Sequence, residues 1–188
     1  PGASVSAEAG TEDEETLFGG TSGPTPMISG SVALLIDAYP DLTPLEIKAR
    51  LMNVAERNIF TNPVTQPGVL APITRIGGGE VRVNRAAVSR TAAWDAGDPE
   101  SVSLSFGTYR TNTSRTFQKK VLVRNYGPSA RTYTISTAFR YPNDAASGAV
   151  TLTGPSSVAV PANSSATFTL TLTLDSLLLP EWTLNGGE

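Results

Sequence analysis

The 188-residue sequence contains neither cysteine nor histidine. Without cysteine there are no disulfides and no thiolate metal ligands. Without histidine the chain cannot assemble a Ser-His-Asp or Cys-His catalytic group from its own residues. No apolar run approaches the roughly 20 residues of a membrane-spanning helix, so we expect no membrane span. The net charge of −3 and the pI near 5.0 indicate no basic surface, and we expect no nucleic-acid partner.

Length and composition indicate a globular chain of one large or two small domains. No charged segment followed by an apolar one precedes Ala3, so no signal peptide is recognisable. The first residues, Pro1 and Gly2, read as the middle of a longer polypeptide. We therefore expect the chain to be a fragment.

A glycine-rich turn with a serine at its end precedes the first apolar segment. Ser22 follows Gly19, Gly20 and Thr21, and the apolar residues 28–36 come directly after the turn. A serine at such a junction can expose its Oγ beside the free N–H groups of the first helical turn. That arrangement suits a nucleophile whose product is an oxyanion. A turn serine without chemistry is the alternative interpretation of these residues.

Helices are predicted on both sides of Pro40. Residues 22–38 are apolar or small almost all the way round, which predicts a helix that is buried on most sides. Thr43 and Glu46 have the spacing of a capping box, with Pro44 between them at the first helical position, so a second helix begins there. A short closing helix is expected around residues 86–88.

The composition changes around residue 94, where we place a domain boundary: residues 1–93, a linker over 94–100, and residues 101–188. Beyond the linker, apolar residues alternate with polar ones. This pattern predicts strands at Val102–Phe106, Thr116–Val123, Tyr133–Thr137, Ser157–Val160 and Ala166–Leu174. Short strands with regular turns between them predict an antiparallel β-sandwich. We expect this sandwich to fold and melt independently of residues 1–93.

The order of motifs in residues 1–93 resembles the C-terminal part of the catalytic domain of subtilisin-like serine proteases (subtilases). The serine signature of that family, Gly-Thr-Ser-x-x-x-Pro, corresponds to residues 20–26. The segments that follow it are also similar, namely the helix at 22–38, Tyr39–Pro44, Ile47–Met52 and Ile76–Asn84. The resemblance implies an α/β subtilisin-like domain, represented here mostly by helices. Residues 101–188 resemble the fibronectin type III-like domain that follows the catalytic domain in large subtilases.

The resemblance implies roles for four residues of the turn. Ser22 is the acylated nucleophile, and its own backbone N–H is one donor to the oxyanion. Thr21 supplies a second, weaker contact, and Gly20 and Pro26 support the signature. The sequence departs from the family pattern at two positions: Gly23, where Met is most common, and Met27, where His is usual.

These roles imply a secreted or cell-envelope serine endopeptidase that cleaves proteins or peptides through an acyl-enzyme on Ser22. The family order is Asp, His, Ser, so the Asp and the His are expected upstream in the same polypeptide, and residues 1–188 alone are expected to be inactive. No cofactor or metal is expected in this chain, and calcium is a candidate ligand of the full-length protein. The acidic residues 12–15 are interpreted as a solvated loop, because they lack the alternating spacing of a calcium loop.

An alternative function remains open: a non-catalytic subtilase-like protein whose β-sandwich acts in adhesion or scaffolding. A sugar-binding role is less favoured, because the sequence shows no array of exposed aromatic residues. Tyr109, Tyr126, Tyr133 and Tyr141 are expected in the core or in turns. The sandwich is then a structural support for the catalytic domain.

Overall fold

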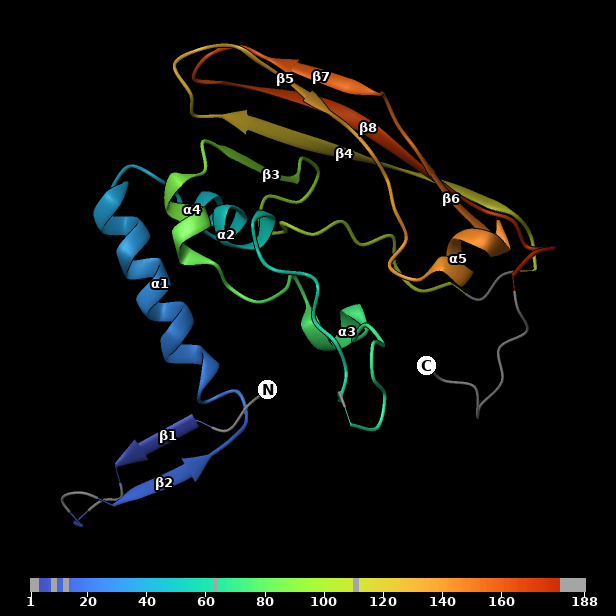
Figure 1. Ribbon diagram of the computed structural model, residues 1–188. Helices are drawn as coiled ribbons and strands as arrows, with labels where there is room; N and C mark the ends of the chain where they lie inside the picture. Colours follow the sequence, from blue (N-terminus) through green and yellow to red (C-terminus); the bar gives the residue numbers. More distant parts are fainter. Residues whose placement is uncertain (1–3, 8–9, 12–13, 63, 110–111, 180–188) are drawn as a thin grey trace.

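The computed structural model describes residues 4–7, 10–11, 14–62, 64–109 and 112–179 (Figure 1). Within these residues the elements follow in the order β1 (Ser4–Ala7), β2 (Glu15–Phe18), α1 (Pro24–Ala38), α2 (Pro44–Asn53), α3 (Ile73–Ile76), α4 (Val83–Val88), β3 (Thr91–Asp95), β4 (Arg115–Asn125), β5 (Arg131–Thr134), α5 (Pro142–Ser147), β6 (Val150–Thr153), β7 (Ser157–Val160) and β8 (Ser164–Leu174). Pro1, Gly2, Glu12 and Asp13 lie outside the described residues.

The helices of the first part pack around a small apolar core. Leu35 of α1, Ile47 and Leu51 of α2 and Ala86 of α4 are its buried members. The predicted start of α2 is confirmed, since the Thr43 hydroxyl accepts the N–H of Glu46 at 3.3 Å and the Glu46 carboxylate accepts the N–H of Thr43 at 2.9 Å. The closing helix expected around residues 86–88 is also confirmed, as α4.

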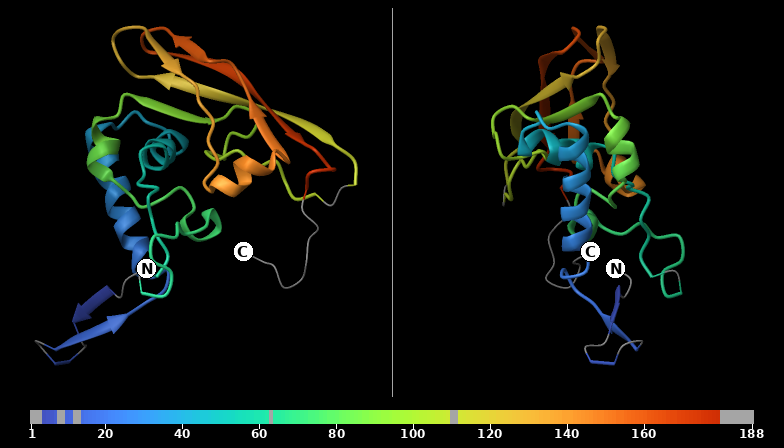
Figure 2. Two further views of the ribbon diagram at one scale, coloured as in Figure 1. Left: turned by 45° about the vertical axis from the view of Figure 1, so that its right-hand side comes forward. Right: turned by 90° about the vertical axis from the view of Figure 1, so that its left-hand side faces the viewer.

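The second part is built on a four-stranded antiparallel sheet with the order β3-β4-β8-β6. Its centre is the long β4–β8 pair, in register from Arg115 opposite Leu174 to Asn125 opposite Ser164. The two-stranded β5–β7 sheet covers one face, where buried Val160 meets Val121, Val123 and Leu170 (Figure 2). The described sheet is small and does not close, so the β-sandwich remains a proposal.

Strand β3 joins the two parts of the chain. It precedes most of the predicted linker, and its sheet partner β4 follows it. Helix α2 covers the face of this sheet opposite β5–β7, since Ala49 of α2 shares a core with Ala92 of β3 and with Val102. The side-chain oxygen of Asn53 in α2 also accepts the free edge N–H of Ala93 at 2.6 Å. The predicted domain limits stay a prediction, but this shared core argues against independent melting.

Two strand predictions need correction. Residues 102–106 were predicted as a strand, and this is wrong: the segment has no ladder partner. The apolar residues of this segment pack in two different cores: Val102 packs with Ala49 of α2, whereas Leu104 packs with the core between β5–β7 and the four-stranded sheet. The strand predicted at Tyr133–Thr137 begins earlier and ends at Thr134. Elements β1, β2, α3, β3, β6 and α5 were not predicted.

A buried ion pair at the end of β3 predicts an acid-sensitive step in unfolding. Asp95, whose side chain is 1% exposed, accepts a hydrogen bond from Lys119 Nζ at 2.5 Å and another from the N–H of Gly97 at 2.8 Å. The hydrogen bond from Lys119 lowers the pKa of Asp95, and burial opposes that shift. Because the folded-state pKa lies below the unfolded value, this stabilisation is present above about pH 4 and is lost as the pH falls through the folded value.

We therefore expect Asp95→Asn to lower stability at neutral pH and to flatten the pH dependence of the free energy of unfolding below about pH 4. Urea unfolding of the complete chain between pH 2.5 and 7 measures both effects. The matched control is Glu100→Gln, at an exposed acid in the following turn. An Asp95→Asn profile parallel to that of the wild type would show that this pair does not set the acid limb.

Candidate active site

Ser22 lies in the turn that leads from strand β2 into helix α1. Gly20 has φ +90°, a backbone conformation that favours glycine, and it redirects the chain after β2. The carbonyl of Thr21 accepts two bonds from Thr25, from its N–H at 3.1 Å and its Oγ1 at 2.7 Å. Ser22 is exposed, and its side chain makes no hydrogen bond to the described residues. The turn therefore presents a free hydroxyl at the start of a helix.

The N–H groups at this helix start are fewer than the sequence suggested. Pro24 and Pro26 occupy the first turn of α1 and have no N–H. The only other N–H of that turn, on Thr25, is bonded to the Thr21 carbonyl. Within the described part of the chain, the backbone N–H groups of Ser22 and Gly23 have no hydrogen-bond acceptor. An oxyanion at this turn would thus depend on the serine's own N–H, rather than on the helix end as a whole.

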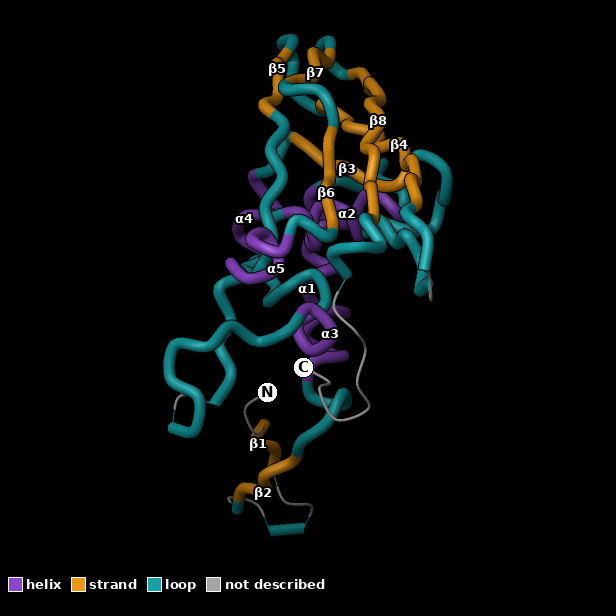
Figure 3. The backbone as a smooth tube through the Cα atoms, turned by 90° about the vertical axis from the view of Figure 1, so that its right-hand side faces the viewer, coloured by secondary structure: helices purple, strands orange, loops and turns teal. Residues whose placement is uncertain are grey.

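Helix α1 is much more exposed than its composition predicts. Ser31 and Leu35 are its buried residues, whereas several large apolar side chains are open to solvent. These are Met27, Ile28, Leu34 and Ile36. The prediction that residues 22–38 are buried on most sides is wrong for the described chain, because only α2 and α4 pack against α1, on one side. Figure 1 shows α1 leading away from the sheet toward the β1–β2 hairpin, and Figure 3 shows this hairpin at the end of the molecule opposite β5 and β7.

The turn itself, residues 19–23, contains no titratable side chain. Glu14 and Glu15 belong to the predicted acidic run, and both are exposed before or at the start of β2. Within the described part of the chain, no group of three or more His, Cys, Asp or Glu side chains is placed to hold a metal ion. The predicted roles of Ser22, Thr21, Gly20 and Pro26 stay predictions. The structure places Gly20, Thr21 and Ser22 in the turn and Pro26 in the first turn of α1.

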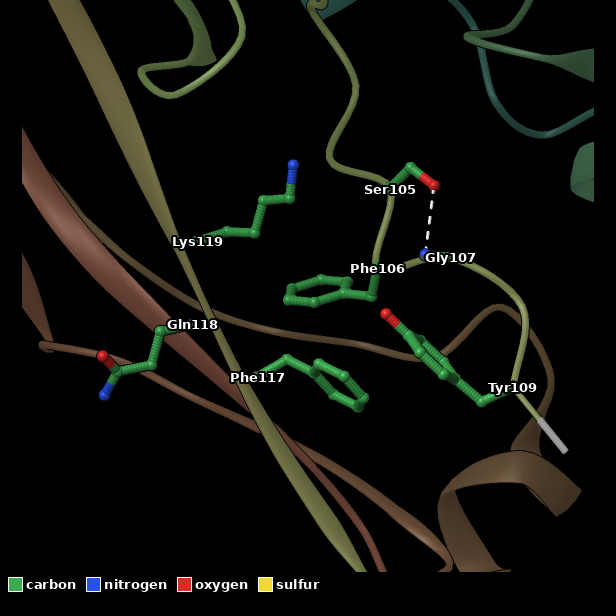
Figure 4. A pocket seen from close by; sticks show the side chains of 7 residues that line it. All are labelled: Ser105, Phe106, Gly107, Tyr109, Phe117, Gln118 and Lys119. Atoms are coloured by element: carbon green, nitrogen blue, oxygen red, sulfur yellow. Dashed lines mark hydrogen bonds between the residues drawn. The ribbon is translucent and has the colours of Figure 1, made fainter. Parts of the chain in front are cut away.

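A separate hollow lies on the sheet, far along the chain from Ser22. It has a volume of about 350 Å³ and is lined by three aromatic rings together with Ser105, Gly107, Gln118 and Lys119 (Figure 4). Tyr109 stacks on Phe117 with ring centroids 4.5 Å apart, and Phe106 is the third ring. Tyr109 is 44% exposed, which departs from the expectation of a core or turn tyrosine. The ring faces that Tyr109 and Phe117 turn toward each other are covered by this stacking.

The contacts between the two parts of the chain were not predicted from the sequence. Tyr126, at the end of β4, donates a hydrogen bond to Glu46 of α2 at 2.7 Å. Arg50 of α2 lies between the rings of Tyr39 and Tyr126. No local sequence signal marks such contacts, because the partners are up to 80 residues apart.

Comparison with known proteins places this chain in a family. The sequence model of the peptidase S8 family, described as the subtilase family, matches residues 2–108, which is more than half of the chain. The chain therefore belongs to the subtilase family. The match extends past the predicted boundary at residue 93 and includes β3.

One curated relative is the subtilisin-like protease SBT3.11 of Arabidopsis thaliana, 36% identical over 92 residues. The aligned region is 45% of this chain and 12% of that protein, so the chain spans only a small part of its relative's length. None of the described helices is long and apolar enough to cross a membrane.

Proposed function

We propose that this chain carries the nucleophile of a serine endopeptidase and that Ser22 is that nucleophile. The observation that carries the proposal is the exposed hydroxyl of Ser22, which lies in the turn that leads into α1 and makes no hydrogen bond to the described residues. Membership of the subtilase family supports a serine peptidase, and so does the similarity to a subtilisin-like protease. The substrates are then proteins or peptides.

In this mechanism Ser22 Oγ attacks the carbonyl carbon of the scissile peptide. A base takes the hydroxyl proton and passes it to the departing amine, so a C–O bond replaces the C–N bond and an acyl-enzyme is left. The Ser22 N–H donates to the oxyanion, with Thr21 as the second contact. Water then releases the acyl group. The base and its partner, a His and an Asp, belong to an upstream part of the same polypeptide.

The remaining parts of the proposal concern the protein as a whole. Gly23 leaves room on the leaving-group side of Ser22, where the family commonly has a larger side chain. Residues 101–188 serve as a fibronectin type III-like support for the catalytic domain. The full-length protein acts outside the cell or at the cell envelope, and calcium is a candidate ligand there.

The test is covalent labelling of the full-length protein with a fluorophosphonate probe, which reacts with activated serines. We expect a single adduct on the peptide that contains Ser22, and none in Ser22→Ala. The matched control is Ser29→Ala: Ser29 is an exposed serine of the helix that follows Ser22, and its Oγ donates to the Thr25 carbonyl at 3.1 Å. This variant should label like the wild type.

A folded full-length protein that takes up no label at Ser22 would contradict the proposal. It would favour the alternative of a non-catalytic subtilase-like protein whose β-strand part acts in adhesion or scaffolding. The isolated 188-residue chain should not label above background, because it contains no histidine to activate the serine.

A further inference from the structure

The segment between α2 and α3 folds back on itself before the chain reaches the sheet. Phe60 and Leu70 form an antiparallel bridge, and hydrogen bonds flank it on both sides. The N–H of Thr61 donates to Val69 O at 2.8 Å, and the N–H of Ala71 donates to Ile59 O at 2.9 Å. We call residues 59–61 and 69–71 the paired legs. This pairing is too short to be stable by itself.

Two consecutive residues of the C-terminal part hold the paired legs. Arg140 donates from Nε to Ala71 O at 2.6 Å, from Nη2 to Ile59 O at 3.1 Å, and from Nη1 to Arg57 O at 3.0 Å. The hydroxyl of Tyr141 adds a bond to Leu70 O at 3.1 Å. Each nitrogen of the guanidinium therefore reaches a different carbonyl: one in each leg, and a third, that of Arg57, just before the first leg.

This use of an arginine differs from an ordinary surface ion pair. Among the described side chains no carboxylate pairs with Arg140, so its charge is met by carbonyl dipoles alone. Hydrogen bonds from a charged donor are stronger than neutral ones, and the planar guanidinium fork fits several acceptors at fixed angles. Both residues precede α5, in the segment that descends from β5 (Figure 1).

The same contact shapes a hollow of about 610 Å³ between the two parts of the chain. Thr61, Gln66 and Arg75 line it from one part, and Tyr141 and Asn143 line it from the other. Neither part provides this lining alone. If the legs separate from residues 140–141, the hollow loses one wall.

We propose that Arg140 and Tyr141 are positioning residues: through them the C-terminal part holds the paired legs in place and completes the hollow between the two parts. These contacts are long-range, because residues 140–141 donate to carbonyls that lie about 70 to 80 positions earlier in the sequence. It is independent of the chemistry proposed for Ser22.

Hydrogen–deuterium exchange on the complete chain tests this inference. In Arg140→Lys, we expect exchange in peptides covering the paired legs to become roughly tenfold faster, because a lysine cannot reach three carbonyls at once. Exchange in the β4–β8 ladder should stay unchanged. The matched control is Arg131→Lys, at an exposed arginine of β5, which should alter neither region.

A second variant is needed if Arg140→Lys also speeds exchange in the β4–β8 ladder. Tyr141→Phe removes one hydroxyl and leaves the guanidinium in place, so exchange should rise in the legs alone. Because the chain has no native cysteine, Thr74→Cys labelled with a fluorophore reports on the hollow, where Thr74 is part of the lining. Iodide quenching of this label should increase in both variants. Unchanged leg exchange and unchanged quenching would overturn the proposal.

Discussion

Replacing Ser22 by alanine in the full-length protein is expected to lower kcat for peptide hydrolysis by roughly six orders of magnitude. This size is taken from nucleophile removal in subtilisin rather than from the present chain. The loss should fall on kcat with little change in KM, since the hydroxyl acts in bond making and not in substrate binding. Steady-state hydrolysis of a chromogenic peptide, supported by single-turnover measurements, separates these two constants.

Ser29→Ala is the control for this measurement, because it removes a hydroxyl from the same helix and leaves the turn untouched. Its kcat should remain within about twofold of the wild type, as for most exposed surface changes. If Ser22→Ala retains a tenth or more of the wild-type kcat, Ser22 does not form the acyl-enzyme.

Replacing Arg50 by alanine is expected to lower the free energy of unfolding by roughly 3 kcal/mol, the range for truncating a large buried side chain. Arg50 is 1% exposed, and its guanidinium carbon lies 4.1 Å from the ring centroid of Tyr39 and 5.1 Å from that of Tyr126. One nitrogen donates to the Ser89 carbonyl, whereas Nε and Nη1 have no hydrogen-bond partner in the described structure. The stack therefore connects α1, α2 and β4 through one buried cation.

A methionine at this position separates packing from charge. Arg50→Met keeps most of the buried length and removes a charge that is costly to desolvate, so it should be clearly more stable than Arg50→Ala. The control is Arg90→Ala, at an exposed arginine, with an expected change within about 0.5 kcal/mol. Chemical denaturation of the complete chain measures all three variants. Equal stability of Arg50→Ala and the wild type would refute the packing role.

The parts of the fold that were predictable carry their signals within a few residues. The capping box at Thr43 and Glu46 begins α2 as predicted, because both hydrogen bonds are local. The long alternation of Thr with Leu and Phe in 166–174 predicts β8, because one face of that strand is buried against β5–β7. The position of Ser22 before a helix was predictable for the same reason, since glycines and prolines mark the turn.

The missed features depend on partners that are distant in sequence. Residues 91–95 include two alanines and overlap the predicted linker at residues 94 and 95, so their strand pairing is specified by β4 rather than by propensity. From the sequence, Arg140 is indistinguishable from an ordinary surface charge, because the carbonyls that it contacts lie about 70 to 80 residues earlier in the chain. Helix α1 was predicted to be buried because its surface is apolar. Burial also requires other groups to cover that surface, and the described residues cover only one side of the helix.

Strand β3 has a consequence for exchanging the C-terminal part between members of the family. Suppose that the C-terminal part is transferred to another family member with its start inside residues 94–100, where the composition changes. Most of β3 would then be left behind, and one edge of β4 would lose its partner strand. A recipient would also need an amide like that of Asn53 and an apolar helix surface like that of α2 to cover the new strand. The natural unit of exchange thus begins before Thr91 and brings requirements for the helix that it docks against.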